Sequence, residues 1–344
     1  MINLVQFPGL GLSLHINRVA ISLGGFNIYW YGIILAAGLM GGLLFAFRYG
    51  PDFGIDTDRM VDVVVIGTVM AIVCARTYYV AMAPFQYQSL WEMMDLRNGG
   101  IAIYGGLIGA FVFGGLACKW RKIPLLQMFD LVAMGFLIGQ GVGRWGNFVN
   151  QEAFGCNTTL PWGMYSEATQ SYLAANAASL AAQGMTVDPT MPVHPTFLYE
   201  SLWCFAGLFM LFRFMKKRCF HGEIFLLYAV WYGCGRFWIE GLRTDSLMLS
   251  AALNLRASQL VAAVSVIVAL ALEIHFRRIY RKAPMMVNLA VADLNAYAKA
   301  FPDGVCAKAL PASASHAEFV QKTKEWNREI QEKAKSADSA QAEE

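Results

Sequence analysis

Seven long apolar runs dominate this sequence and limit the folds that it can adopt. They cover residues 28–47, 61–83, 101–118, 126–143, 196–214, 223–241 and 258–276. A helix that crosses a bilayer needs about 20 mostly apolar residues. Only 15% of the 344 residues are charged, whereas soluble domains carry roughly 25%. We therefore predict an all-α integral membrane protein with about seven transmembrane helices.

Basic residues follow alternate runs and orient the predicted helices. They gather at residues 48–59, 119–122, 213–218 and 277–282. Because basic loops stay in the cytoplasm, this pattern places the N-terminus outside and the C-terminus inside the cell. The chain is then divided into an external surface segment (1–27), a seven-helix membrane domain (28–283) with an external arm (156–192), and a charged cytoplasmic tail (284–344). Within the arm, Ser166–Gly184 is predicted to be helical.

The stretch Gly141–Gly155 interrupts the apolar pattern with polar side chains. Arg144, Asn147 and Asn150 are three residues apart and can share one helix face. Ionisable side chains near membrane depth usually mark a functional site. Arginine suits a phosphate because its planar group binds two oxygens at once, and Glu152 is one candidate counter-charge. We predict an anion site here, the alternative being an arginine that only snorkels to the interface.

A second polar group lies in the sixth apolar run. Tyr232, Arg236, Glu240 and Arg243 follow one another at spacings of 4, 4 and 3, so they line one helix face. Arg236 and Glu240 are one turn apart and can also be read as a purely structural ion pair. Two arginines against one glutamate leave an excess positive charge, however, and lipid phosphate is the nearest abundant anion. We predict that this group binds an anionic lipid.

Three further positions have both a functional and a structural interpretation. Tyr31 and Tyr104 are either interfacial aromatic residues or site residues. His194, at the entry to the fifth run, is either a base or a structural histidine.

Two sets of glycines are predicted to permit close helix packing; they are Gly38, Gly41 and Gly42, and Gly105, Gly106 and Gly109.

Four motifs occur in order along the chain. They are WYG at residues 30–32, GRxGNFxNxExxG at 143–155, HP…LYE at 194–200 and RFxxExxR at 236–243. Together they resemble the prolipoprotein diacylglyceryl transferase family, over about residues 25–280. The resemblance implies transfer of the diacylglyceryl group of phosphatidylglycerol to the lipobox cysteine of a preprolipoprotein, with release of glycerol phosphate. It also implies a multi-pass protein of the bacterial cytoplasmic (inner) membrane, which we expect to be a monomer.

The resemblance gives the polar residues roles in this reaction. Arg144 and Arg236, with Arg243 near them, would hold the anionic phosphodiester and stabilise charge on the leaving group. The expected catalytic set is Arg144, Arg236, Tyr104 and Asn147. The expected phosphatidylglycerol-binding set is Arg144, Tyr31, Asn147, Glu152, Gly155, Tyr232, Arg236, Glu240 and Arg243. The nucleophilic thiol belongs to the substrate peptide.

One position departs from the family pattern. Many members carry HGGL where this chain has Tyr104-Gly105-Gly106-Leu107. A tyrosine with an ordinary pKa of about 10 is a poor base at neutral pH. We therefore predict that Tyr104 positions the substrate. Either His194 or ionisation assisted by the arginines would then supply the thiolate.

Other membrane functions fit the sequence less well. The main alternative is a secondary transporter or lipid flippase with an anion site, for which an inverted repeat and helix breaks near mid-membrane are expected. Neither is evident in the sequence. An intramembrane protease would need a Ser/His, Asp/Asp or HExxH arrangement, which is also missing. We see no metal-ligand spacing, phosphate loop or dinucleotide motif, so we predict no cofactor, no metal and no nucleic-acid partner.

Overall fold

The computed structural model describes residues 2–24, 26–83, 85, 87, 89–95, 99–218, 220–244, 248–250, 255–280, 325 and 332. The predicted tail over residues 284–344 therefore lies outside the described residues, apart from Glu325 and Glu332. The long helices are α1 (Trp30–Tyr49), α2 (Thr57–Met82), α4 (Ile103–Arg121), α5 (Leu125–Asn150), α7 (Thr196–Phe214), α8 (Glu223–Leu242) and α9 (Ala257–Tyr280). Each coincides with one predicted apolar run.

Six helices of the described chain are long and apolar enough to cross a membrane. The exception among the long helices is α8, which carries Arg236 and Glu240. The protein is therefore a mostly helical, multi-pass membrane protein, as the apolar runs predicted. The seventh crossing and the orientation of the termini remain predictions.

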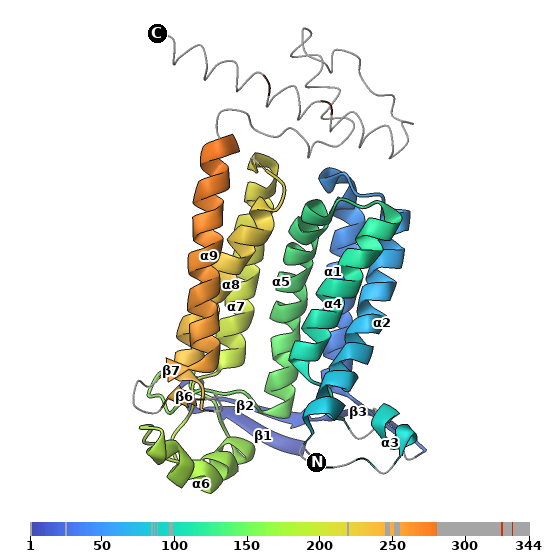
Figure 1. The fold of residues 1–344 in the computed structure, drawn as a ribbon. Coiled ribbons are helices and arrows are strands. Elements are labelled where there is room, and N and C mark those ends of the chain that lie inside the picture. Colours follow the sequence, from blue (N-terminus) through green and yellow to red (C-terminus); the bar gives the residue numbers. More distant parts are fainter. Residues whose placement is uncertain are drawn as a thin grey trace, which may run out of the picture. The chain divides into compact units, whose positions relative to one another are not determined.

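The chain divides into two compact units. Among the described residues, unit 1 comprises residues 2–46 and 132–280 with the gaps given above, and unit 2 is built around residues 47–131. In unit 1, α8 packs between α7 and α9, and Figure 1 shows these three helices (yellow to orange) side by side. In unit 2, α2 packs against α4.

Close helix contacts are formed at the glycines that the sequence singled out. In unit 1, a Cβ atom on Gly38 of α1 would lie 3.2 Å from the Gly139 carbonyl of α5, and one on Gly42 would lie 3.1 Å from that of Gly135. In unit 2, a Cβ atom on Gly109 of α4 would lie 2.6 Å from the Cβ of Cys74 on α2. These contacts confirm the packing role predicted for the two glycine sets.

Short strands surround the helix ends of unit 1, although the sequence predicted no strand there. Strands β1 (Ile2–Phe7), β2 (Leu12–Asn17) and β5 (Tyr165–Ser166) form an antiparallel sheet in the order β2-β1-β5. The remaining strands form two hairpins, β3 (Val19–Leu23) with β4 (Phe26–Tyr29) and β6 (Met248–Ser250) with β7 (Leu255–Arg256). The segment 1–27, expected only to lie on the surface, is thus largely β-structure.

A small apolar core joins this sheet to the arm over residues 156–192. Val5 and Phe7 of β1 are buried together with Met164, Leu173 and Val193. The arm contains α6 (Glu167–Ala182), the helix predicted within Ser166–Gly184. A capping box between Ser166 and Thr169 begins this helix by satisfying its first backbone donors. The arm is therefore a folded layer with its own core.

In unit 2, one arginine organises the segment that leads into α4. Arg76 of α2 donates from Nε to the Met93 carbonyl at 2.7 Å and from Nη1 to the Gly100 carbonyl at 2.7 Å. Met93 belongs to the short helix α3 (Leu90–Met94). Because one planar group bonds both segments, it fixes the approach to Tyr104 at the start of α4.

Candidate active site

The polar residues of the Gly141–Gly155 stretch lie mostly on a continuous helix. The fourth apolar run ends at residue 143, and α5 continues through the polar residues to Asn150, as their shared helix face predicted. Arg144 and Asn147 share a helix face as predicted, and Arg144 Nη1 donates to Asn147 Oδ1 at 3.4 Å. The helix rather than a loop therefore sets the direction of the guanidinium group.

The turn after α5 fixes Glu152 beside this face. Gln151 and Ala153 both adopt left-handed backbone conformations, with φ of 55° and 57°. Such conformations cost free energy in residues other than glycine and often occur at functional sites. Glu152 Oε1 accepts hydrogen bonds from the side chains of Asn147 at 3.0 Å and Asn150 at 3.2 Å. Glu152 thus orients the two asparagines.

The carboxylate that pairs with Arg144 comes from another helix. Arg144 Nη2 of α5 lies 2.5 Å from Oε2 of Glu200 on α7. Glu152 was the counter-charge predicted for Arg144, and Glu200 was in neither of the predicted site sets. Glu200 ends the HP…LYE motif at the entry to α7, which was the available signal for its role.

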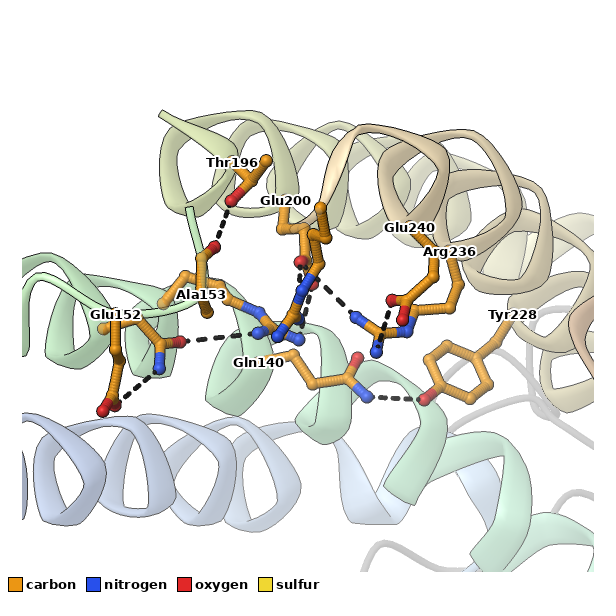
Figure 2. A network of polar contacts seen from close by, with 11 residues as sticks. Gln140, Glu152, Ala153, Thr196, Glu200, Tyr228, Arg236 and Glu240 are labelled. Atoms are coloured by element: carbon orange, nitrogen blue, oxygen red, sulfur yellow. Dashed lines mark hydrogen bonds and ion pairs between the residues drawn. The ribbon is translucent and has the colours of Figure 1, made fainter. Parts of the chain in front are cut away.

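Helix α8 brings its own charged groups to the same glutamate. Arg236 Nη2 lies 2.7 Å from Glu240 Oε2 one helical turn away, and its Nη1 lies 3.5 Å from Glu200 Oε1. Arg243 Nη1 lies 3.8 Å from Glu200 Oε1. Figure 2 shows Glu200, Arg236 and Glu240 pointing toward one another from α7 and α8. We call Arg144, Arg236, Arg243, Glu200 and Glu240 the arginine cluster.

The arginine cluster is largely shielded from solvent. The side chains of Glu200 and Glu240 are 6% and 5% exposed, and those of Arg144, Arg236 and Arg243 are 19%, 24% and 12% exposed. Charges in such a place interact more strongly than they do in water. The arginines remain more accessible than the carboxylates, so the cluster can offer guanidinium donors to an incoming anion.

Three other predicted lipid-binding residues lie around this cluster. The ring of Tyr31 on α1 packs on Gly146 of α5, where an added Cβ atom would lie 2.8 Å from Tyr31 Cδ2. Tyr232 of α8 stacks on Tyr228, with ring centroids 5.7 Å apart. Gly155 is packed too closely for a side chain, because its Cβ atom would lie 2.7 Å from the Cβ of His194.

His194 is held by a short chain of hydrogen bonds. Its Nδ1 lies 3.1 Å from the Tyr199 hydroxyl, and Trp162 Nε1 donates to the same hydroxyl oxygen at 2.8 Å. Because Trp162 is the donor in its bond to Tyr199, the Tyr199 hydroxyl can donate its own proton to His194 Nδ1. Partial burial lowers the pKa of His194 below its ordinary value, so the neutral ring is favoured.

Comparison with known proteins identifies the family of this chain. The sequence model of the prolipoprotein diacylglyceryl transferases matches residues 18–275. The phosphatidylglycerol–prolipoprotein diacylglyceryl transferase of Bacillus cytotoxicus is 43% identical over 242 residues, which are 70% of this chain and 86% of the relative. Those of Bacillus cereus and Bacillus anthracis are 44% identical over the same length and shares. The chain belongs to the prolipoprotein diacylglyceryl transferase family. The resemblance inferred from four motifs is thus confirmed.

Tyr104, the position at which this chain departs from the HGGL pattern of the transferase family, lies at the start of α4 in unit 2. Its side chain is 67% exposed. Within the described residues, no group of three or more His, Cys, Asp or Glu side chains is placed to hold a metal ion. The functional groups that the structure brings together in this transferase are therefore arginines, carboxylates, amides and phenols.

Proposed function

We propose that this protein transfers the diacylglyceryl group of phosphatidylglycerol to the lipobox cysteine of preprolipoproteins, the first step of lipoprotein maturation. The thiol releases its proton to solvent, and the sulfur forms a bond to the lipid methylene carbon next to the phosphate. The carbon–oxygen bond breaks, and its electron pair stays on the phosphate oxygen. The observation that carries the proposal is the shielded arginine cluster in a chain of this family.

The arginines would act on the phosphate of the lipid. Arg144 and Arg236 bind its non-bridging oxygens, and Arg243 adds charge beside them. As the carbon–oxygen bond breaks, negative charge grows on the phosphate, and prearranged guanidinium groups stabilise that charge. Glu240 supports this role, because its ion pair with Arg236 holds the guanidinium group in place.

The neutral groups would hold the headgroup and the acyl end of the lipid. Asn147, oriented by Glu152, donates to the headgroup. Tyr31 and Tyr232 donate their hydroxyl groups to phosphate or glycerol oxygens. We assign Gly155 to the wall of the headgroup site, because the absence of a side chain lets this segment pack against His194.

The thiolate would be formed with the help of the arginine charge. A thiol with an ordinary pKa near 8.5 needs only a modest shift to ionise, and neighbouring cations provide one. We assign Tyr104 to positioning of the substrate. We assign His194 to an orienting role, because its Nδ1 is engaged by the Tyr199 hydroxyl.

We further propose a seven-span monomer in the bacterial inner membrane, with α8 as the additional crossing. The N-terminus and the arm over residues 156–192 would lie outside, and the charged tail inside. The alternation of basic residues supports this orientation. The reaction would then occur at the outer leaflet, where precursor lipoproteins expose the lipobox.

The decisive experiment measures the reaction with purified components. The protein is reconstituted with phosphatidylglycerol labelled in its diacylglyceryl group and a lipobox peptide. We expect one labelled thioether and one glycerol phosphate for each turnover, detected by mass spectrometry. Absence of transfer by folded protein, with both substrates verified, would refute the proposed function.

Variants of two arginines test the role of the cluster. Arg144→Ala is expected to abolish nearly all turnover while the protein remains folded. Arg213→Ala is the matched control, because Arg213 lies at the last turn of α7 over the Phe209 ring and not in the cluster. Full activity of Arg144→Ala would remove Arg144 from the mechanism.

A further inference from the structure

Glu200 occupies an unusual position for a carboxylate in an anion site. Its two oxygens face all three arginines, at 2.5 Å from Arg144, 3.5 Å from Arg236 and 3.8 Å from Arg243. It comes from α7, whereas its partners come from α5 and the end of α8. One side chain therefore gathers three guanidinium groups that the backbone alone would not bring together.

Glu200 also sets the charge of the cluster. Its carboxylate lies no more than 3.8 Å from each of the three guanidinium groups, so its negative charge lowers the positive charge that they present to an anion. Glu152 belongs to the wider network only through Asn147, and it is exposed. Its charge is therefore screened by solvent.

An arginine cluster whose positive charge is limited suits the substrate better than the product. A lipid phosphodiester carries one negative charge, but a phosphate monoester carries close to two at neutral pH because its second pKa is near 6. A more positive site would hold the monoester tightly and slow its departure. Because the monoester carries more negative charge, a carboxylate among the arginines weakens the binding of the monoester more than that of the phosphodiester.

We infer that Glu200 is a positioning residue that prearranges the three arginines and, by limiting their net charge, allows the phosphate monoester product to leave. This inference rests on the proposed function. It differs from a purely structural role, because it requires the charge of the side chain and not only its shape. Two substitutions separate these properties.

Glu200→Gln keeps the shape and removes the charge. Affinity for glycerol 3-phosphate and for inorganic phosphate is measured by calorimetry on the full chain in detergent, without turnover. We expect both anions to bind at least about tenfold more tightly, since one opposing charge within the cluster is lost. During turnover, glycerol 3-phosphate should inhibit more strongly, and kcat should fall more than KM. Unchanged anion affinity in this variant would overturn the inference.

Glu200→Asp keeps the charge and shortens the side chain. We expect product affinity within about twofold of the wild-type value, since the net charge is unchanged. The KM for phosphatidylglycerol should rise, because the carboxylate no longer reaches Arg144. If Glu200→Gln does not fold, Glu200→Asp is the test on its own. Tighter anion binding by Glu200→Asp than by the wild type would then overturn the inference.

Glu167→Gln controls for removal of an acidic group as such. Glu167 is exposed in the first turn of α6, and its loss should leave anion affinity unchanged. Wild-type transfer is measured in parallel. If the wild-type protein transfers nothing, the proposed function fails, and the calorimetry still tests the charge effect of Glu200 independently.

Discussion

Trp203 and Trp231 hold each other by two reciprocal hydrogen bonds. Each indole Nε1 donates to the backbone carbonyl of the other residue at 2.9 Å, and the rings stack with centroids 4.4 Å apart. Trp203 lies one turn after Glu200 on α7, and Trp231 lies before Arg236 on α8. The pair therefore fixes the two helices that meet in the arginine cluster.

Gly235→Ala is expected to destabilise the protein by disturbing this pair. A Cβ atom on Gly235 would overlap the Trp203 indole, which cannot move aside without losing its hydrogen bond. Overpacking of this kind costs about 1–3 kcal/mol, read as a lower midpoint of thermal unfolding in detergent. In the control variant Gly114→Ala the new methyl group meets nothing within 4 Å. Equal midpoints for the two variants would show that the pair is not rigid.

Ala153→Gly is expected to stabilise the turn after α5. Ala153 has a φ of 57°, a conformation that glycine adopts without steric cost. After subtraction of the greater freedom of glycine in the unfolded chain, we expect a gain of about 0.5–1 kcal/mol in the free energy of unfolding. Ala175→Gly, within the exposed face of α6, should instead lose about 1 kcal/mol. A loss of stability in Ala153→Gly would contradict this account of the turn.

Substitutions of Glu152 should distinguish hydrogen bonding from charge. Glu152→Gln retains an oxygen that can accept from Asn147 and Asn150, so we expect a kcat/KM within about fivefold of the wild-type value. Glu152→Ala releases both amides and should lower kcat/KM by more than about tenfold, mainly through KM. Steady-state kinetics on phosphatidylglycerol provides the measurement. Equal losses in both variants would instead assign the effect to the carboxylate charge.

The stability of unit 1 should depend on pH through His194. Burial lowers its pKa in the folded state, so the unfolded chain binds more protons below the ordinary value near 6.5. Stability is complete above that value and is lost as pH falls through the lower, folded pKa. His194→Gln should flatten the dependence of the unfolding free energy on pH over this window. Burial also lowers the pKa of His221, to about 3, and this affects stability in the same direction. The contribution of His194 is therefore read from the difference in unfolding free energy between the wild type and His194→Gln at each pH.

Tyr104→Phe tests whether the phenol positions the substrate or takes its proton. A positioning hydrogen bond is worth about 0.5–1.5 kcal/mol, so kcat/KM should fall by no more than about tenfold. Loss of a general base would lower the rate by about 10²–10⁴. A loss in the second range, with wild-type thermal stability, would make Tyr104 the base.

The sequence predicted the helices well because the length and hydropathy of an apolar run identify a membrane span. It also placed Arg236 and Glu240 together, because residues four apart on a helix must meet. The N-terminal strands were missed because their short alternating pattern is interrupted by glycine and was interpreted as an interfacial segment. The three-residue spacing of Arg144, Asn147 and Asn150 predicted a helix beyond the apolar run, and α5 does continue to Asn150.

Glu200 was missed for a different reason. Its partners lie on other helices, and a single sequence holds no direct information on which helix faces which. Glu152, which is the nearer acid in the sequence, was therefore predicted as the counter-charge of Arg144. In the structure Arg144 pairs with Glu200. Only the motif at the entry to α7 marked the position as unusual.

The ion pair between Arg144 and Glu200 also gives the membrane part an order of assembly. Synthesis delivers α5 to the bilayer before α7, so the guanidinium group of Arg144 enters an apolar region without the carboxylate that later neutralises it. An uncompensated charge in a membrane helix is expensive. The charge of Arg144 is therefore neutralised only after α7 has supplied Glu200.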